Sequence, residues 1–466
     1  MRRRLLFILL PLVLSMALVA PSLAAPEKVT ISICYHHAGE PWAKIMRETV
    51  DRAIAIFKSK MKELGLDVDV KVIELPITVD EDYKAKLVLD IKAGRAADII
   101  FVDSFWVPEF VEAGYLLPLP VQDWTGWGKF YPAMRGMVTY KGKAYALMFD
   151  TDVRLIYYNK VLFKKVGLPE DWRPRSWSDI IEAARIIKKK LPDVTPIQFY
   201  AITAQGEATS MQSFYMWLLG ALPKEAVTSG NWLYDFKRGK WVIYKSAWLD
   251  TLKIYKLVFV DEKLGDISIQ LEKGGTAWQP LQSGVRDRKV AMLIDGSWVV
   301  CGWSPIGVFP WPARDKELGW APMPGSGKPD TMKIVCVSGG WTYAINAFTK
   351  HPLLAWEFLK VLGSADVISY WCSVSVHIPT REDATLNPKL FPKDPSAVKL
   401  NDEMAKAIMP YTTYRPARPE YPKVSTLIQQ LVEKVATGAA GPEAALDSFV
   451  AQLKKLVGPE NVEVLP

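Results

Sequence analysis

The chain has 466 residues, of which 50% are hydrophobic and 23% charged, with 58 basic and 50 acidic side chains. This length is enough for two or three domains with substantial cores. The lysines and arginines are interleaved with acids or spaced along expected helices. This argues against a nucleic-acid-binding protein, which would gather basic residues on one face.

The first 25 residues have the pattern of a secretory signal peptide. Three arginines at positions 2–4 precede an apolar run over 5–20, and the small-residue stretch Ser22-Leu23-Ala24-Ala25 follows. The run is shorter than the ~20 residues that a membrane span needs, and Pro11 interrupts it. We therefore expect removal of residues 1–25 by cleavage after Ala24 or Ala25, and a periplasmic or extracellular, cell-surface location.

The residues after this segment alternate between strand-like and helix-like periods. Apolar spacing predicts strands over 29–35, 68–72 and 97–102, and amphipathic helices over 41–64 and 82–93. Strands that alternate with helices are typical of an α/β domain, and here they predict a mainly parallel sheet.

The middle of the chain continues with shorter elements. The periods predict a helix over 107–113, a hairpin over 138–147, a strand over 150–160 and helices over 161–166 and 178–190. Ser176 precedes the last of these and offers an N-cap hydroxyl. Residues 205–262 are expected to be rich in helix.

The remaining elements are spread over the last third. The pattern predicts a strand over 290–294 and helices over 353–362, 427–435 and 442–456. Since no linker rich in Gly or Ser separates two blocks, a chain with two domains would cross between them more than once. The four cysteines, Cys34, Cys301, Cys336 and Cys372, form no C-x-x-C pair, and their pairing stays open.

Seven groups of segments carry a resemblance to a known family. They are 97–103 with 114–119, 140–145, 155–160 with 174–177, 289–298, 318–324, 339–345 with 355–359, and 378–381. Their order along the chain resembles that of the extracellular solute-binding proteins of ABC importers, specifically the sugar-binding, maltose-binding-protein-like group. Each segment is weak alone, and their common order makes the signal specific.

The resemblance implies a periplasmic-binding-protein-like α/β fold of two lobes with a ligand cleft between them, closing by hinge motion. We expect one lobe at 26–149 plus 341–378 and the other at 150–340 plus 379–466. The hinge crossings would lie near Asp150, Gly339-Gly340 and Pro379.

A sugar-binding cleft needs aromatic side chains against the C–H faces of the ring and carboxylates or amides for its hydroxyls. Trp298 follows a buried strand where the resembling family places a stacking aromatic, and Trp341 follows the expected Gly339-Gly340 hinge. Asp152 matches a position where maltose-binding relatives carry an acid. The alternatives are core packing for the tryptophans and, for Asp152, a capping role or pairing with Arg154 or a surface lysine.

Two further groups lie at the expected carboxyl ends of strands, where ligands of open α/β sheets bind. Asp103 and Trp106 follow the 97–102 strand, and Glu40 and Trp42 follow the first strand. The alternative role of Asp103 is to cap a helix, and that of Trp42 is to begin the buried stripe of the helix that follows. The resemblance adds Tyr215 and Trp217, which a core stripe explains almost as well.

The function implied is a carbohydrate receptor that performs no chemistry and delivers sugar or oligosaccharide to a membrane permease of an ABC importer. We expect a monomer without cofactor. Four histidines without H-E-x-x-H spacing make a metal site improbable. One rival is a secreted glycoside hydrolase using Asp150 and Asp152. The other keeps the fold and binds a peptide, polyamine or oxyanion. The sugar's identity, length and linkage stay open.

Overall fold

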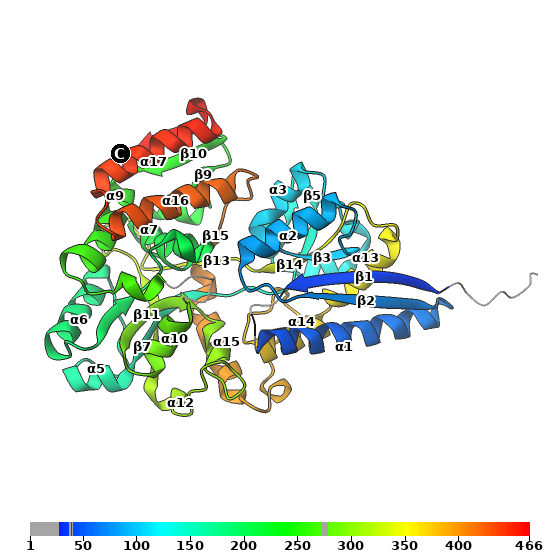
Figure 1. The fold of residues 1–466 in the computed structure, drawn as a ribbon, viewed down its shortest axis with the longest axis horizontal. Coiled ribbons are helices and arrows are strands. Elements are labelled where there is room, and N and C mark those ends of the chain that lie inside the picture. Colours follow the sequence, from blue (N-terminus) through cyan, green and yellow to red (C-terminus); the bar gives the residue numbers. More distant parts are fainter. Residues whose placement is uncertain (1–27, 37–38, 40, 272–277) are drawn as a thin grey trace, which may run out of the picture.

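The computed structural model describes residues 28–36, 39, 41–271 and 278–466, and folds them into two α/β lobes, as the resemblance implied (Figure 1). The expected signal segment, residues 1–25, and Glu40 lie outside the described residues. Within the described ranges, no helix combines the length and apolar character that a membrane crossing requires.

The first lobe is built on a five-stranded sheet in the order β2-β1-β3-β14-β6. Its strands are β1 (Val29–His36), β2 (Val68–Leu75), β3 (Ile99–Asp103), β6 (Ala146–Met148) and β14 (Trp341–Ile345). The first three are parallel, as predicted, but β14 runs antiparallel to both β3 and β6. The sheet is therefore mixed, because β14 enters this lobe on a return crossing from the other one.

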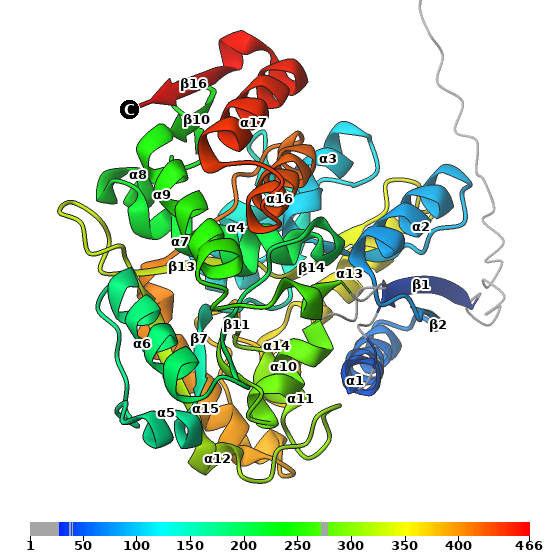
Figure 2. The ribbon, with the colours of Figure 1, turned by 60° about the vertical axis from the view of Figure 1, so that its left-hand side comes forward.

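Helices cover both faces of this sheet (Figure 2). They are α1 (Trp42–Glu63), α2 (Asp80–Lys92), α3 (Val107–Glu112), α4 (Pro132–Met137), α13 (Pro352–Leu362) and α14 (Ala365–Ser375). Buried residues of α1 recur at helical spacing, and Phe57 packs against Phe358 of α13 at 5.0 Å between ring centroids. The predicted hairpin is confirmed: β4 (Thr139–Tyr140) pairs with β5 (Lys143–Ala144).

The second lobe is built on a six-stranded sheet in the order β15-β13-β12-β7-β11-β8. Its strands are β7 (Arg154–Asn159), β8 (Thr195–Gln198), β11 (Val290–Gly296), β12 (Leu318–Pro324), β13 (Ile334–Ser338) and β15 (Thr412–Tyr414). β7 lies inside this sheet, antiparallel to β11 and β12, and all six of its residues are buried. The strand predicted over 150–160 is therefore shorter, and residues 150–153 belong to a crossing between the lobes.

A small sheet and eleven helices complete the described part of the second lobe. The strands are β9 (Tyr234–Asp235), β10 (Lys240–Tyr244) and β16 (Val462–Leu465). The helices are α5 (Lys160–Val166), α6 (Trp177–Lys190), α7 (Tyr215–Ala221), α8 (Lys224–Thr228), α9 (Lys245–Lys256), α10 (Trp278–Arg286), α11 (Val299–Gly302), α12 (Arg314–Glu317), α15 (Pro395–Ile408), α16 (Tyr421–Ala436) and α17 (Pro442–Val457). Ser176 does hold the N-cap position of α6, but its hydroxyl is bonded to that of Ser178 and makes no capping hydrogen bond.

Three chain segments join the lobes: β6 to β7, β13 to β14, and α14 to α15. At their meeting point Thr151 and Ile378 exchange backbone hydrogen bonds of 3.0 and 2.9 Å, and the Thr151 hydroxyl donates to the Gly339 carbonyl. Gly340 has φ +152, and a Cβ there would stand 2.0 Å from the Asp150 carbonyl oxygen. Only glycine fits this close approach. The residue boundaries of the lobes themselves stay a prediction.

All four cysteines are buried with free thiols.

Residues 380–382 still contact the first lobe, where the Tyr131 N–H donates to the Thr380 carbonyl at 3.1 Å. Residues just after the expected crossing at Pro379 thus lie against the first lobe, and the crossing itself stays a prediction.

Candidate functional site

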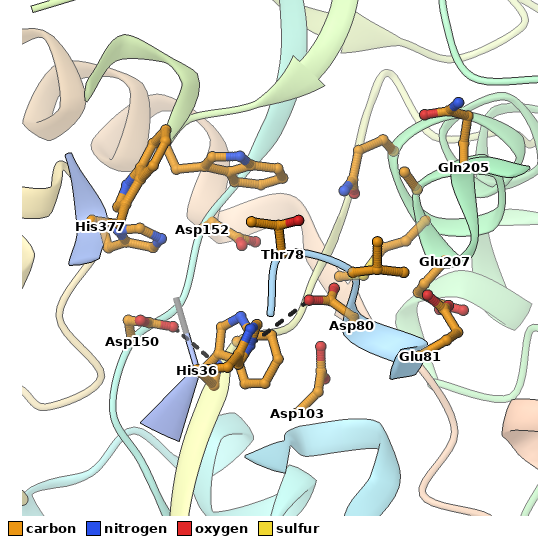
Figure 3. Close-up of a pocket in the computed structure, with 18 of the residues that line it drawn as sticks. His36, Thr78, Asp80, Glu81, Asp103, Asp150, Asp152, Gln205, Glu207 and His377 are labelled. Atoms are coloured by element: carbon orange, nitrogen blue, oxygen red, sulfur yellow. Dashed lines mark hydrogen bonds and ion pairs between the residues drawn. The ribbon is translucent and has the colours of Figure 1, made fainter. Parts of the chain in front are cut away.

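A cavity of about 290 Å³ lies between the two lobes, beside the three connecting segments (Figure 3). β1 and β3 end at this cavity, with His36 and Asp103 in its wall. Ligands of open α/β sheets bind at such strand ends. Residues from both lobes face the same space, so its size depends on how the lobes are placed.

The first lobe contributes an aromatic wall. Trp341, the first residue of β14, lies opposite Asp103 in the β3–β14 ladder. Its ring stacks on Phe101 with centroids 4.8 Å apart and planes 11° apart, and the His36 ring is 4.5 Å away. Trp42, at the start of α1, also lines the cavity. The stacking holds Trp341 in one orientation, with part of its surface exposed.

The second lobe presents Trp298, just after β11. Gly296 makes room for this ring, because a Cβ at residue 296 would stand 1.6 Å from it. The Arg154 guanidinium lies 5.0 Å from the centroid of the ring. Trp298 is only partly buried, so aromatic surface faces the cavity from both lobes.

Arg154 and Asp152 form an ion pair in the cavity wall. The guanidinium also donates to the Gln212 amide oxygen at 3.0 Å and to the Val337 carbonyl at 3.2 Å. Burial lowers the pKa of Arg154, but a guanidinium with a carboxylate partner stays charged at neutral pH. Asp152 therefore does form the alternative pair with Arg154 that the sequence left open, and it still lines the cavity.

Arg415 connects the two lobes through charge. Its guanidinium donates to Asp103 of the first lobe at 2.9 Å and to Glu207 of the second at 3.3 Å, and lies 4.4 Å over the Phe105 ring. Its side chain is 4% exposed. Burial disfavours the charge of Arg415, but Asp103 and Glu207 outweigh this and raise its pKa. Asp103 also caps Phe105 through its backbone N–H, the alternative role expected for it.

Asp150 lies in the connecting segment and is 1% exposed. Its carboxylate accepts hydrogen bonds from the Trp341 N–H at 3.0 Å and the Trp371 indole at 2.8 Å. Burial raises the pKa of this carboxyl, opposed by His377 and by these hydrogen bonds. Burial lowers the pKa of His377, and the neighbouring Asp150 opposes this shift.

Three carboxylates of the wall were not predicted from the sequence: Asp80 and Glu81 at the start of α2, and Glu207 in the second lobe. The His36 ring lies 3.7 Å from the Asp80 carboxylate. Burial, Glu81 and Asp103 raise the pKa of Asp80, although 49% of its side chain is exposed and cleft water offsets part of this. A strand-end signal was present, since β2 runs parallel to β1 and the loop after it leads to the same edge.

Five of the predicted site residues line the cavity: Trp42, Asp103, Asp152, Trp298 and Trp341. Three do not. Trp106 is buried and packs edge-on against Trp341 at 5.6 Å, while Tyr215 and Trp217 are fully buried in the second lobe. Glu40 lies outside the described residues. In the part of the chain that the structure describes, no three His, Cys, Asp or Glu side chains are grouped to hold a metal ion.

Comparisons with known proteins give consistent matches. The sequence profile of the family described as bacterial extracellular solute-binding protein matches residues 50–368. An ABC transporter extracellular-binding protein of Pyrococcus horikoshii is 22% identical over 400 residues, which cover 84% of this chain and 82% of the relative.

Two solved structures share the fold. A solute-binding protein of Thermotoga lettingae bound with alpha-D-tagatose is 26% identical with a TM-score of 0.72, covering 92% of this chain and 100% of that one. Maltose-bound MalE3 of T. maritima is 23% identical with a TM-score of 0.71 and the same coverage.

Proposed function

The chain belongs to the bacterial extracellular solute-binding proteins, and from this premise we propose that its interlobe cavity captures a sugar. As a member of this family it is the extracellular binding component of an ABC transporter, which passes its ligand to a membrane permease. We propose that it does so as a monomer, by closing the two lobes around a carbohydrate.

One observation carries this proposal: partly exposed tryptophans face the cavity from both lobes, with carboxylates beside them. Trp341 stands opposite Asp103, and Trp298 stands beside the Arg154–Asp152 pair. Aromatic faces suit the apolar C–H faces of a sugar, and carboxylates accept hydrogen bonds from its hydroxyls. The tagatose and maltose bound by the two Thermotoga proteins are further support.

We propose no catalytic step. A glycosidase needs two carboxyl groups beside the scissile bond, one of them free to donate a proton. Asp150 is buried and accepts two hydrogen bonds, and Asp152 is paired with Arg154, so neither stands ready for that role. Release of reducing sugar from oligosaccharides by the purified protein, lost in Asp152→Asn, would favour the hydrolase instead.

The test of this function is a thermal-shift screen of the purified protein. The panel contains mono- and disaccharides, with amino acids, peptides, spermidine and glycerol 3-phosphate as controls. A ligand at 100 times its dissociation constant adds about 2.7 kcal/mol to the native state, which raises Tm by a few degrees. A response to sugars supports the proposal, and a response to the controls alone contradicts it.

A matched pair of variants then locates the site. Trp341→Ala should weaken sugar binding by about 1–3 kcal/mol, since it removes a stacking surface of the cavity. Trp320→Ala, a partly buried tryptophan of β12 that is no part of the cavity wall, should bind normally. Equal calorimetric affinities in the two variants would refute the role of Trp341.

A further inference from the structure

The charges of the cavity wall are unbalanced. Among the described residues that line it stand six carboxylates and two guanidiniums. Both guanidiniums already hold acids, Arg154 with Asp152 and Arg415 with Asp103 and Glu207. Asp80, Glu81 and Asp150 pair with neither guanidinium, and the single charge of Arg415 faces two carboxylates, so the wall carries a surplus of negative charge.

The surplus is concentrated at one end of the cavity. Figure 3 shows Asp80, Glu81, Asp103 and Glu207 gathered on one side, with Asp150 and His377 on the other. Among the described residues, Asp80 has the His36 ring 3.7 Å from its carboxylate, and no lysine or arginine forms an ion pair with Asp80 or Glu81. Like charges in a partly enclosed space repel one another, and a cation placed among them would relieve this repulsion.

A second, independent observation points to a ligand that donates hydrogen bonds. Gln282, in α10 and also in the cavity wall, is 3% exposed. Its amide nitrogen donates to Asp295 at 3.3 Å, and its amide oxygen has no hydrogen-bond partner within the protein. A buried acceptor without a donor costs free energy, which a ligand N–H or O–H can offset.

The acidic end adjoins the aromatic wall. The centroid of the His36 ring lies 4.5 Å from that of Trp341, and its Nε2 atom lies 3.7 Å from the Asp80 carboxylate. A sugar ring on Trp341 therefore places a substituent within reach of Asp80 and Asp103. An oxyanion at the same place would meet carboxylates, which repel it.

We propose, resting on the carbohydrate function above, that the ligand is an amino sugar whose free ammonium group lies among Asp80, Glu81 and Asp103. The ring stacks on Trp341, and the ammonium forms charge-assisted hydrogen bonds with the carboxylates. The positive charge also offsets the repulsion from Glu81 and Asp103, which adds to the effect of burial in raising the pKa of Asp80.

The test compares sugars that differ only in one substituent. Glucosamine, N-acetylglucosamine, glucose and glucuronate form one set. The corresponding galactose and mannose series test the stereochemistry of the ring. Three disaccharides test its length: chitobiose with free amines, N-acetylated chitobiose, and cellobiose. We expect one of these series to bind. Within it, isothermal calorimetry should give the free-amine sugar an affinity at least about tenfold above that of its neutral parent, the sugar with a hydroxyl in place of the amine. The uronate should not bind. The amine advantage should shrink between low and 0.5 M salt.

Variants of α2 supply the control. Asp80→Asn should remove most of the amine advantage, so that the affinities of the free-amine sugar and of its neutral parent become similar. Asp90→Asn, the same substitution near the other end of α2, should keep the advantage, because Asp90 pairs with Lys86 away from the cavity.

Each contrary outcome is distinct. Neutral or N-acetylated sugars that bind as tightly as the amines overturn this inference and leave the sugar function standing. Binding of glucuronate or glycerol 3-phosphate overturns it through the sign of the charge. Binding of spermidine with no sugar overturns the proposed function itself, and the amino-sugar assignment with it.

Discussion

The core of the second lobe and the wall of the cavity are both rich in tryptophan, yet they use it differently. In the core, Trp217 is fully buried and packs edge-on against Trp177 at 5.4 Å, and Trp248 stacks on Phe449 at 4.9 Å. In the cavity wall, Trp298 and Trp341 are only partly buried. The core rings are enclosed by one lobe, whereas the wall rings face the space between two.

The difference follows from where each ring is attached. Trp217 belongs to a helix, α7, that is buried on all sides. Trp341 and Trp298 follow Gly340 and Gly296, at points where a Cβ would collide with the Asp150 carbonyl or with the Trp298 ring. Glycine lets the backbone turn closely there and directs the next aromatic side chains to the cavity. Core tryptophans should therefore control unfolding, and wall residues should control closure and binding.

The largest effect expected from this distinction is on the core. Trp217→Ala should lower the free energy of unfolding by about 3–5 kcal/mol, because it removes a large side chain from a closely packed interior. Chemical denaturation followed by circular dichroism measures it. Sugar affinity of the folded variant should stay near that of the parent protein, and a selective loss of affinity would instead make Trp217 a binding residue.

The milder Trp217→Phe sharpens the same test. The indole N–H of Trp217 has no hydrogen-bond partner within the protein. Replacing the indole with a phenyl ring therefore removes an unsatisfied donor and keeps most of the apolar contact. We expect a clearly smaller loss of stability than for Trp217→Ala in the same experiment.

The next effect concerns the charged contact between the lobes. Arg415→Met should leave Asp103 and Glu207 facing each other without their cation when the lobes are together. Breaking a buried ion pair costs about 3 kcal/mol, which shifts the closure equilibrium roughly a hundredfold toward the open form. Small-angle scattering should show a larger radius of gyration.

Arg418→Met is the matched control for closure. Arg418 lies three residues away, is more exposed, and pairs with Glu420 of its own lobe. Its scattering profile should match that of the parent protein. A compact Arg415→Met variant would show that the Arg415 contacts do not hold the lobes together.

The sequence predicted much of the fold because periodicity reports burial. Spacing identified β1, α1 and β7 within a few residues, and the order of segments predicted the two lobes. Periodicity did not predict that the sheets are mixed. The direction of a strand depends on which crossing returns the chain to its sheet, and this is a long-range property that local spacing does not report.

The cavity was predicted in part for a related reason. Trp298 and Trp341 carry a local signal, an aromatic after glycine at a strand end. Tyr215 carries the spacing of a helix, which a core and a cleft share, and its hydroxyl bonds to Tyr421 inside the second lobe. Arg415 reaches the cavity through tertiary placement alone and stands in no motif, whereas Asp80 follows the end of β2 and carries only that strand-end signal.

The smallest expected effect distinguishes the contribution of the second-lobe wall to binding from that of the first-lobe wall. Trp298→Ala should weaken ligand binding by about 1–3 kcal/mol through lost stacking, at the lower end because the Arg154 guanidinium already covers part of the ring. Unfolding should change less than for Trp217→Ala, since Trp298 is only partly buried. Calorimetry beside a denaturation curve measures both. An unchanged affinity would assign ligand stacking to Trp341 alone, and a loss of stability equal to that of Trp217→Ala would place Trp298 with the core residues.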